Sequence, residues 1–194
     1  MSLTEEMHGS MKADIRYWHK RLPYLADPNL IPTWRTLETG SLSAGLMHNA
    51  MQAKGIKANL DDIRAAKNHA AAVPRRSELV RVGHRFLEGL APGLAREAVF
   101  ERSHIFGLRL CLPDIGPELR LAYDDQPEKD DVSIAMYPQP AVHGYIFVLG
   151  NNGSHGTGKY LIGHSGSDDW RPWTWMGTPY LRDWIFEKIP APQL

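Results

Sequence analysis

The chain is organised around the stretch Gly150-Asn-Asn-Gly-Ser-His-Gly-Thr-Gly-Lys-Tyr-Leu-Ile-Gly-His-Ser-Gly-Ser-Asp-Asp-Trp170. The apolar run Val142 to Leu149 precedes this stretch, and the run Tyr160 to His164 lies inside it. Both runs have the length of strands, and glycine between them permits turn conformations that a Cβ atom forbids. We therefore expect two neighbouring strands joined by a loop rich in glycine and histidine.

Working outward from this pair, near-alternating apolar residues predict further strands. With the pair above, the expected strands are residues 105–112, 119–123, 132–137, 142–149 and 160–164. Short links between consecutive strands are typical of antiparallel pairing. Thr178-Pro179 has the form of a helix start, because proline suits the first helical position, so we predict a C-terminal helix through Trp184 and Phe186.

Helical patterns dominate the first half of the chain. Ser43 to Lys54 reads as a helix closed by Gly55, and Asn59 is a good N-cap for a helix through Ala72. The other helical segments expected are residues 2–22, a short turn at 34–37 that ends at Gly40, a helix capped by Ser77 with Leu79 and Val82 inward, and residues 92–102.

These patterns together predict an α+β fold in one domain, residues 1–194. An N-terminal helical segment of four to five helices, about residues 1–102, is followed by a β-rich segment, residues 103–194. The second segment holds a five-stranded, mainly antiparallel sheet and the C-terminal helix. We expect the two segments to share one core, since neither alone has a comfortable size for a domain.

Composition limits the classes of protein to consider. The hydrophobic fraction of 43% and the charged fraction of 23% are ordinary for a soluble globular protein. A formal charge of zero gives no bulk attraction to nucleic acid or to an anionic membrane. The polar N-terminus does not resemble a signal peptide, and no apolar run approaches the roughly 18 residues of a membrane span. We therefore expect a cytoplasmic protein that does not enter a membrane.

Charge and cysteine content add two further expectations. Residues 1–107 hold 15 Lys and Arg against 11 Asp and Glu, net +4, and residues 108–194 hold 7 against 11, net −4. The two halves either attract each other or differ by chance. The single cysteine, Cys111, excludes an internal disulfide and a cysteine-based zinc site, and its apolar surroundings indicate a buried, inert thiol.

Proton-transfer groups gather in the stretch from residue 150 to residue 175. His164 is the candidate general acid or base, Asp168 or Asp169 would orient it, and His155 would be a second proton donor. Four more residues are candidates for substrate binding: Lys159 and Arg171 for negative charge, Trp170 and Trp173 as walls of a pocket. Metal binding by His155, His164 and an aspartate is chemically possible, but their spacing fits no known metal-site pattern, and the sequence does not identify a cofactor. A polar surface loop with hydrogen-bonded histidines accounts for the same residues.

Two short sequence patterns bear on the function of this loop. Gly153 to Lys159 has the spacing of a phosphate-binding loop, but Tyr160 stands where that motif needs Ser or Thr, and a strand follows instead of a helix. His-Gly-Ser at 8–10 and His-Gly-Thr at 155–157 resemble the tripeptide that holds the nicotinamide ribose in ADP-ribosyl-transferring enzymes. That resemblance covers three residues each time and would make such a transfer one form of an enzyme hypothesis.

Arg75, Arg76, Arg81, His84 and Arg85 form a basic edge, and Asp124 to Asp131 form an acidic loop. The basic edge is a solvated helix face, a site for an anion or an acidic partner, or the intramolecular counterpart of the acidic loop. The sequence therefore supports two functions. The first is a small enzyme using His and Asp acid–base chemistry on a polar or phosphate-bearing substrate at residues 150–175. The second is a non-catalytic protein-binding module, of the immunity or adaptor type, with the Trp-rich C-terminal segment as its interface.

Overall fold

The computed structural model describes residues 31–69, 73–83, 103, 106–136, 146–152, 157–164, 174–175, 178–179 and 183–189. In chain order its elements are β1 (Arg35–Thr39), α2 (Ala44–Ala53), β2 (Lys57–Ala58), α3 (Leu60–Asn68), β3 (Arg75–Val82), β4 (Leu108–Arg109), α6 (Ile115–Ala122), β5 (Asp130–Ile134), β6 (Ile146–Asn151), β7 (Lys159–His164), β8 (Thr174–Trp175), β9 (Thr178–Pro179) and β10 (Asp183–Lys188).

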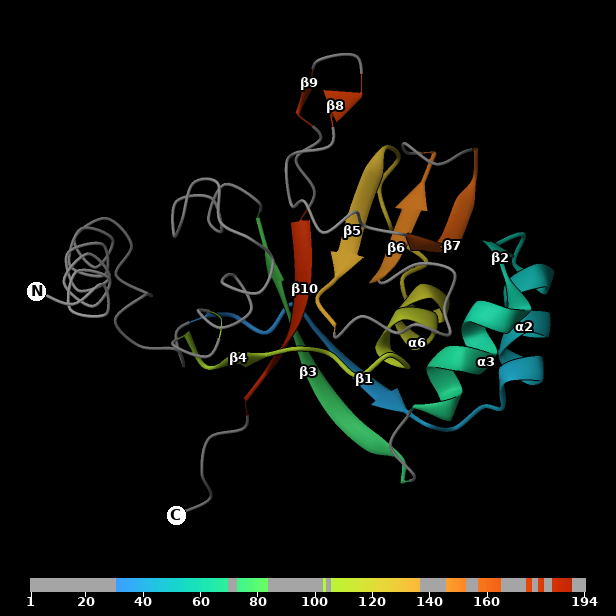
Figure 1. Cartoon of the computed structure of the whole chain (residues 1–194), viewed down its shortest axis with the longest axis horizontal. Coiled ribbons are helices and arrows are strands. Elements are labelled where there is room, and N and C mark those ends of the chain that lie inside the picture. Colours follow the sequence, from blue (N-terminus) through green and yellow to red (C-terminus); the bar gives the residue numbers. More distant parts are fainter. Residues whose placement is uncertain are drawn as a thin grey trace, which may run out of the picture.

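A curled sheet of eight strands forms the centre of the described part of the molecule (Figure 1). The strand order is β1-β3-β10-β5-β6-β7-β2, and β4 pairs with the C-terminal end of β10. β10 runs parallel to β5 and β2 runs parallel to β7, whereas the other neighbours in the sheet are antiparallel. β8 and β9 form a separate two-stranded sheet. Strands from both halves of the chain therefore share one mixed sheet.

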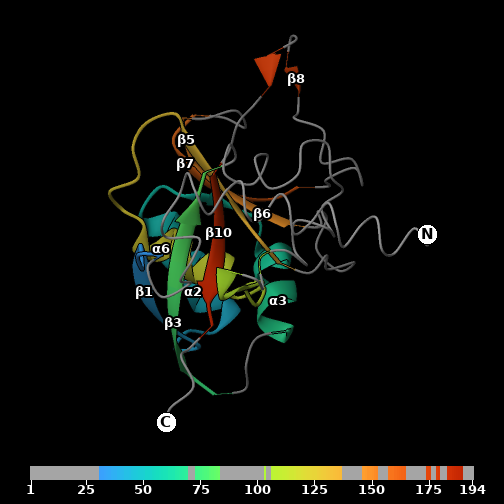
Figure 2. The same cartoon turned by 90° about the vertical axis from the view of Figure 1, so that its left-hand side faces the viewer.

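Helices α2, α3 and α6 pack against one another, and α6 contacts β1, β6 and β7 (Figures 1 and 2). Gly116 allows α6 to approach β6 closely, since a Cβ at this position would lie 2.6 Å from the ring of Phe147. Ser43 caps α2 through a hydrogen bond from the Leu46 amide, and Asn59 caps α3 through the Asp61 amide. The Asn59 cap confirms the prediction for α3, although α3 ends at Asn68 and not at Ala72. The helix predicted from Ser43 is present as α2, with Ser43 as its cap.

The predicted fold class is wrong in its balance of helix and strand. The part of the chain that the structure describes has three helices and a mixed eight-stranded sheet, not four to five N-terminal helices and a five-stranded sheet. The expected helices at 2–22 and 92–102 lie outside the described residues. The predicted strands around 132–137, 142–149 and 160–164 are present as β5, β6 and β7.

Two segments of the first half are strands where helix was predicted. The expected turn of helix at 34–37 is β1, in which buried Leu37 and Thr39 alternate with exposed Thr36 and Glu38. The helix expected to start at Ser77 is β3, which is paired on both sides, by β1 and β10. The spacing of the apolar residues here suits either structure, and pairing with strands distant in sequence decides between them.

Two segments of the second half are also corrected. Residues 119–123, predicted as a strand, belong mostly to α6, where Ile115 and Leu119 are buried one turn apart. Pro117 lies in the first turn of this helix, where a missing amide hydrogen costs nothing. The predicted C-terminal helix is instead β10, whose residues Trp184 to Glu187 are buried on both faces because β10 is a central strand.

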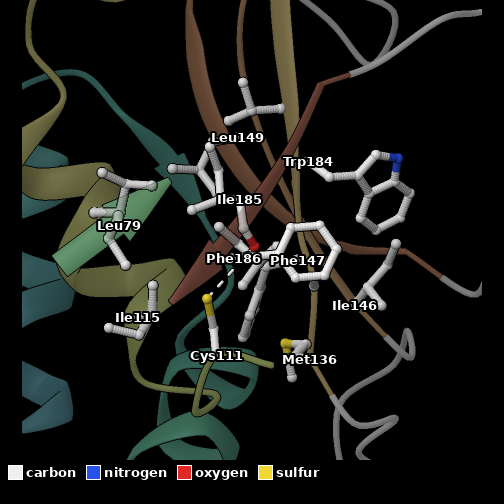
Figure 3. Packing of buried hydrophobic residues seen from close by; sticks show 14 of the residues in the cluster. Leu79, Cys111, Ile115, Met136, Ile146, Phe147, Leu149, Trp184, Ile185 and Phe186 are labelled. Atoms are coloured by element: carbon white, nitrogen blue, oxygen red, sulfur yellow. Dashed lines mark hydrogen bonds between the residues drawn. The ribbon is translucent and has the colours of Figure 1, made fainter. Parts of the chain in front are cut away.

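The core includes side chains from both faces of β10 (Figure 3). Cys111 is buried there, and its Sγ donates a hydrogen bond to the Ile185 carbonyl at 3.4 Å. Burial raises the pKa of this thiol well above its ordinary value, so the thiol stays protonated. The buried, unreactive cysteine expected from the sequence is confirmed.

A polar row crosses the second half of the sheet. Asp131 of β5, Gly150 of β6 and Tyr160 of β7 are in register, and the Tyr160 hydroxyl donates to Asp131 Oδ1 at 2.5 Å. The two buried side chains meet over Gly150, where a Cβ would clash with both. Gly150 is therefore required by the contact between its neighbours.

Candidate functional site

The structure places two of the eight predicted site residues. Lys159 begins β7 and His164 ends it, so their Cα atoms are about 17 Å apart at the usual rise of a strand. His155, Asp168, Asp169, Trp170, Arg171 and Trp173 lie outside the described residues. The proposed site of residues 150–175 therefore stays a prediction, and Lys159 and His164 are not adjacent in it.

Lys159 has an intramolecular role. Its Nζ donates to the Asp124 carbonyl oxygen at 2.5 Å, while Lys54 Nζ donates to the Leu121 carbonyl at 3.1 Å and to Asp124 Oδ2 at 2.6 Å. The hydrogen bond from Lys54 lowers the pKa of the Asp124 carboxyl. Both lysines thus lie at the C-terminal end of α6, where cations satisfy free carbonyls and oppose the negative end of the helix dipole.

The segment between α6 and β5, residues 123–129, is held by a fully buried arginine. Arg120 Nη2 donates to the Tyr123 carbonyl at 2.5 Å, and Nη1 donates to the Gln126 side chain and, at 3.4 Å, to the Gly150 carbonyl. Burial lowers the pKa of Arg120 to about 10. Carbonyl oxygens from two elements therefore surround this guanidinium and fix the segment against β6.

Next to this segment lies a cluster that we name the Arg81 junction: Arg81, Tyr123, Asp130 and Asp183. Arg81 Nη2 donates to Asp130 Oδ1 at 2.6 Å, and its Nε donates to Asp183 Oδ2 at 2.6 Å. Tyr123 accepts from Arg81 Nη1 at 3.0 Å and donates to Asp130 at 2.9 Å. Burial lowers the pKa of Arg81, but the hydrogen bonds to Asp130 and Asp183 outweigh burial and raise it. The acidic loop thus meets the basic edge within the molecule.

A second group, the Arg35 site, comprises Trp34, Arg35, Tyr123 and Asp125. The Arg35 guanidinium carbon lies 4.9 Å from the centre of the Trp34 ring and 4.6 Å from that of Tyr123. Those two rings meet edge to face at 5.0 Å. Arg35 Nη2 donates to Asp125 Oδ1 at 2.5 Å, whereas the buried Nε has no hydrogen-bond partner among the described residues. Two aromatic rings thus hold a guanidinium that is only partly satisfied.

A third polar group joins the start of α6 to β1, β3 and α3. Lys67 Nζ donates to Glu118 Oε1 at 2.6 Å, and the Gly40 amide donates to the same oxygen at 3.0 Å. Arg75 bonds Asp114 at 3.3 Å, and burial raises the pKa of Asp114 even though Arg75 opposes this shift. These pairs are largely enclosed, so we assign them to holding α6 in place.

The charge difference between the halves of the chain has a structural counterpart. Among the described residues, six ion pairs join a base before residue 107 to an acid after it: Arg35–Asp125, Lys54–Asp124, Lys67–Glu118, Arg75–Asp114, Arg81–Asp130 and Arg81–Asp183. The acidic loop and Arg81 were noted in the sequence, but Trp34 and Arg35 were missed as site residues. Their only local signal was an aromatic residue next to an arginine, in a segment predicted as helix.

Neither a metal site nor a membrane span is found in the ranges that the structure describes. Those residues hold no group of three or more His, Cys, Asp or Glu side chains that could bind a metal ion. Among the same residues, no helix combines the length and the apolar character needed to cross a bilayer. The chain matches no known protein family, no curated protein and no solved structure.

Proposed function

We propose that this protein is a non-catalytic protein-binding module and that the Arg35 site is an anchor of its interface. The observation that carries this proposal is the pair of partly exposed side chains Trp34 and Arg35, packed on the buried ring of Tyr123. Arg35 keeps 25% of its side chain exposed, and Trp34 is partly exposed, so a partner can reach both. Trp, Tyr and Arg are the residue types enriched among binding hot spots.

Rigidity supports this role. A long side chain that becomes ordered on binding loses conformational entropy, roughly 0.5 to 1.5 kcal/mol per side chain. The rings of Trp34 and Tyr123 already fix the Arg35 guanidinium, and Arg81 and Asp130 in turn fix the Tyr123 hydroxyl. Arg35 is therefore preorganised for a partner.

The position of the site in the sheet supports the same role. Trp34 directly precedes β1, the edge strand at one end of the strand order among the described residues. Thr33, Thr36 and Glu38 beside it are exposed, so the Arg35 site adjoins an accessible strand. A binding module of this kind requires no proton-transfer group.

Site-directed photocrosslinking tests the proposal. A photoreactive phenylalanine at Thr36, next to Arg35, is compared with one at exposed Gln52 on α2 in the cells that produce the protein. We expect a discrete crosslinked protein from position 36 that disappears when Arg35→Gln is added and persists when Arg64→Gln is added. Identical adducts from positions 36 and 52, or adducts that ignore Arg35→Gln, would contradict the proposal.

The acid–base enzyme remains a prediction with its own test. A thermal-shift screen against nucleotides, sugar phosphates and divalent metals is run beside the His164→Ala variant. A compound that stabilises the wild-type protein but not a folded His164→Ala variant would support a small-molecule site in residues 150–175. No shift with any compound would contradict that site.

A further inference from the structure

We infer that Arg35 binds a carboxylate of the partner and that Asp125 occupies the place of that carboxylate in the free protein. The inference rests on the proposed binding function and names the chemistry of the partner: an acidic segment of a protein.

Arg35 has more unused hydrogen-bonding capacity than Arg81 beside it. An arginine presents five N–H donors in a planar fork that matches a carboxylate. Arg81 directs its donors to Asp130, Asp183 and Tyr123. Arg35 makes one ion pair, with Asp125 through Nη2, and no hydrogen bond from its Nη1 is found in the described part of the chain. Its Nε also lacks a hydrogen-bond partner there but is buried, so a partner would approach the two terminal nitrogens. A second acceptor at Arg35 would therefore add a bond that the free protein lacks.

Asp125 is easily displaced. Its side chain is 73% exposed, and within the described ranges its one contact with a charged group is the ion pair to Arg35. Exposed ion pairs are weak because water screens both charges and each side chain loses freedom. Asp124, the next residue, is bonded instead to Lys54. Asp125 can thus swing into solvent while Asp124 and Arg120 keep the segment in place.

The surrounding charges favour a carboxylate over a phosphate. Asp125, Asp130 and Asp183 all lie within the linked Arg35 site and Arg81 junction, and they balance Arg35, Arg81 and the nearby Arg120. A carboxylate that replaces Asp125 keeps this balance. A phosphate dianion adds negative charge beside three existing carboxylates. The aromatic wall of Trp34 offers apolar contact to the carbon chain of a glutamate.

The experiment is a titration with the end-blocked peptide acetyl-(Glu)6-amide, monitored through the ¹⁵N-labelled Nε–H resonance of Arg35, which Arg35→Lys identifies by its loss. We expect this resonance to shift on titration. Asp125→Ala removes the internal competitor and should tighten binding about threefold, as expected for one exposed ion pair. Asp61→Ala is the matched control, since Asp61 is also exposed and also paired with an arginine, Arg64.

Each outcome is decisive for the inference. The inference is supported if the Arg35 resonance shifts and if the peptide binds more tightly to Asp125→Ala but not to Asp61→Ala. An unmoved Arg35 resonance in both the wild-type protein and Asp125→Ala overturns it, as does equal tightening in both variants. A shift caused by a thymidine oligonucleotide and not by the peptide overturns it in favour of a phosphate. If a crosslink at position 36 depends on Arg35 but the Arg35 resonance does not move, the binding function is supported and the carboxylate inference is not.

Discussion

Arg81 and Arg35 lie beside the same Trp34 ring, with guanidinium carbons 5.8 Å and 4.9 Å from its centre, yet they serve different ends. Both are 25% exposed. Arg81 is bonded by two carboxylates and a tyrosine from three segments, whereas Arg35 is bonded by one exposed carboxylate on a loop. The two guanidinium groups are therefore equally exposed but differ in the number of hydrogen bonds that they make.

Because of this difference we assign Arg81 a structural role and propose Arg35 as the binding residue. A guanidinium such as that of Arg81, whose three nitrogens all donate hydrogen bonds, joins strands and leaves little for a partner. A guanidinium that is stacked on aromatic rings but has unbonded N–H donors is fixed in position and can still bind an acceptor. The number of acceptors within reach, more than charge or exposure, separates the Arg81 junction from the Arg35 site.

The largest effect is expected at the Asp131–Gly150–Tyr160 row, a buried polar contact of the sheet. Gly150→Ala places a Cβ against both neighbours and should lower the free energy of unfolding by about 3 kcal/mol. Gly45→Ala is the matched control, since nothing lies near its Cβ, and alanine in α2 should be neutral or stabilise by about 0.5 to 1 kcal/mol. Urea denaturation measures both, and equal stabilities would refute the packing argument.

The contrast between the two arginines predicts unequal costs of removal. Arg81→Met leaves two carboxylates without their cation and should destabilise the protein by about 2 to 3 kcal/mol. Arg35→Met breaks one exposed ion pair and should cost less than about 1 kcal/mol. Thermal and urea unfolding of the two variants provide the comparison. A larger cost at Arg35 would reverse the roles given to them.

A pH effect is expected at Tyr123, which the two clusters share. Burial and the hydrogen bond to Asp130 raise the pKa of Tyr123 from 10.0 to about 12. The folded state therefore holds the phenolic proton more tightly than the unfolded state. This stabilisation is complete below pH 10 and is lost as the pH rises to about 12, at a cost of about 1 to 2 kcal/mol. Between pH 10 and 12 the free energy of unfolding should fall less steeply in Tyr123→Phe than in the wild-type protein. If the two pH profiles are parallel, ionisation of Tyr123 does not contribute to the loss of stability.

The smallest effect on stability is expected at Asp125. Because this side chain is mostly exposed, Asp125→Ala should change the free energy of unfolding by less than about 0.5 kcal/mol. The same variant is expected to bind the hexaglutamate peptide more tightly. A loss of stability as large as that of Arg81→Met would make Asp125 a structural residue and not a displaceable one.

Local signals in the sequence predicted part of this fold correctly. Asn59 caps α3 as expected, because a cap depends on residues within one turn, and the helix predicted from Ser43 is present as α2. The strand pair around residue 150 also follows from its own apolar runs and glycines. Local signals failed at β3, α6 and β10, where apolar spacing fits either structure and distant pairing partners decide.

The candidate sites divide in the same way. The acidic loop and Arg81 were visible as opposite charges, and the structure joins them. The Arg35 site could not be predicted, because Trp34, Arg35 and Tyr123 come from segments that were assigned the wrong secondary structure. Stacking between residues almost ninety positions apart leaves no periodic trace in a sequence.

The sequence by itself determined the capped helices, the hairpin strands, the buried cysteine and a charge difference between the halves, since each depends on neighbours along the chain or on composition. Only the tertiary structure decided that β3 and β10 are central strands. It also decided that all three nitrogens of Arg81 donate hydrogen bonds, whereas Arg35 donates through Nη2 alone in the described part of the chain. The physical reason is that strand pairing and ion pairing depend on distance in space. The register of the sheet brings Asp130 and Asp183 to Arg81 and leaves only Asp125 for Arg35.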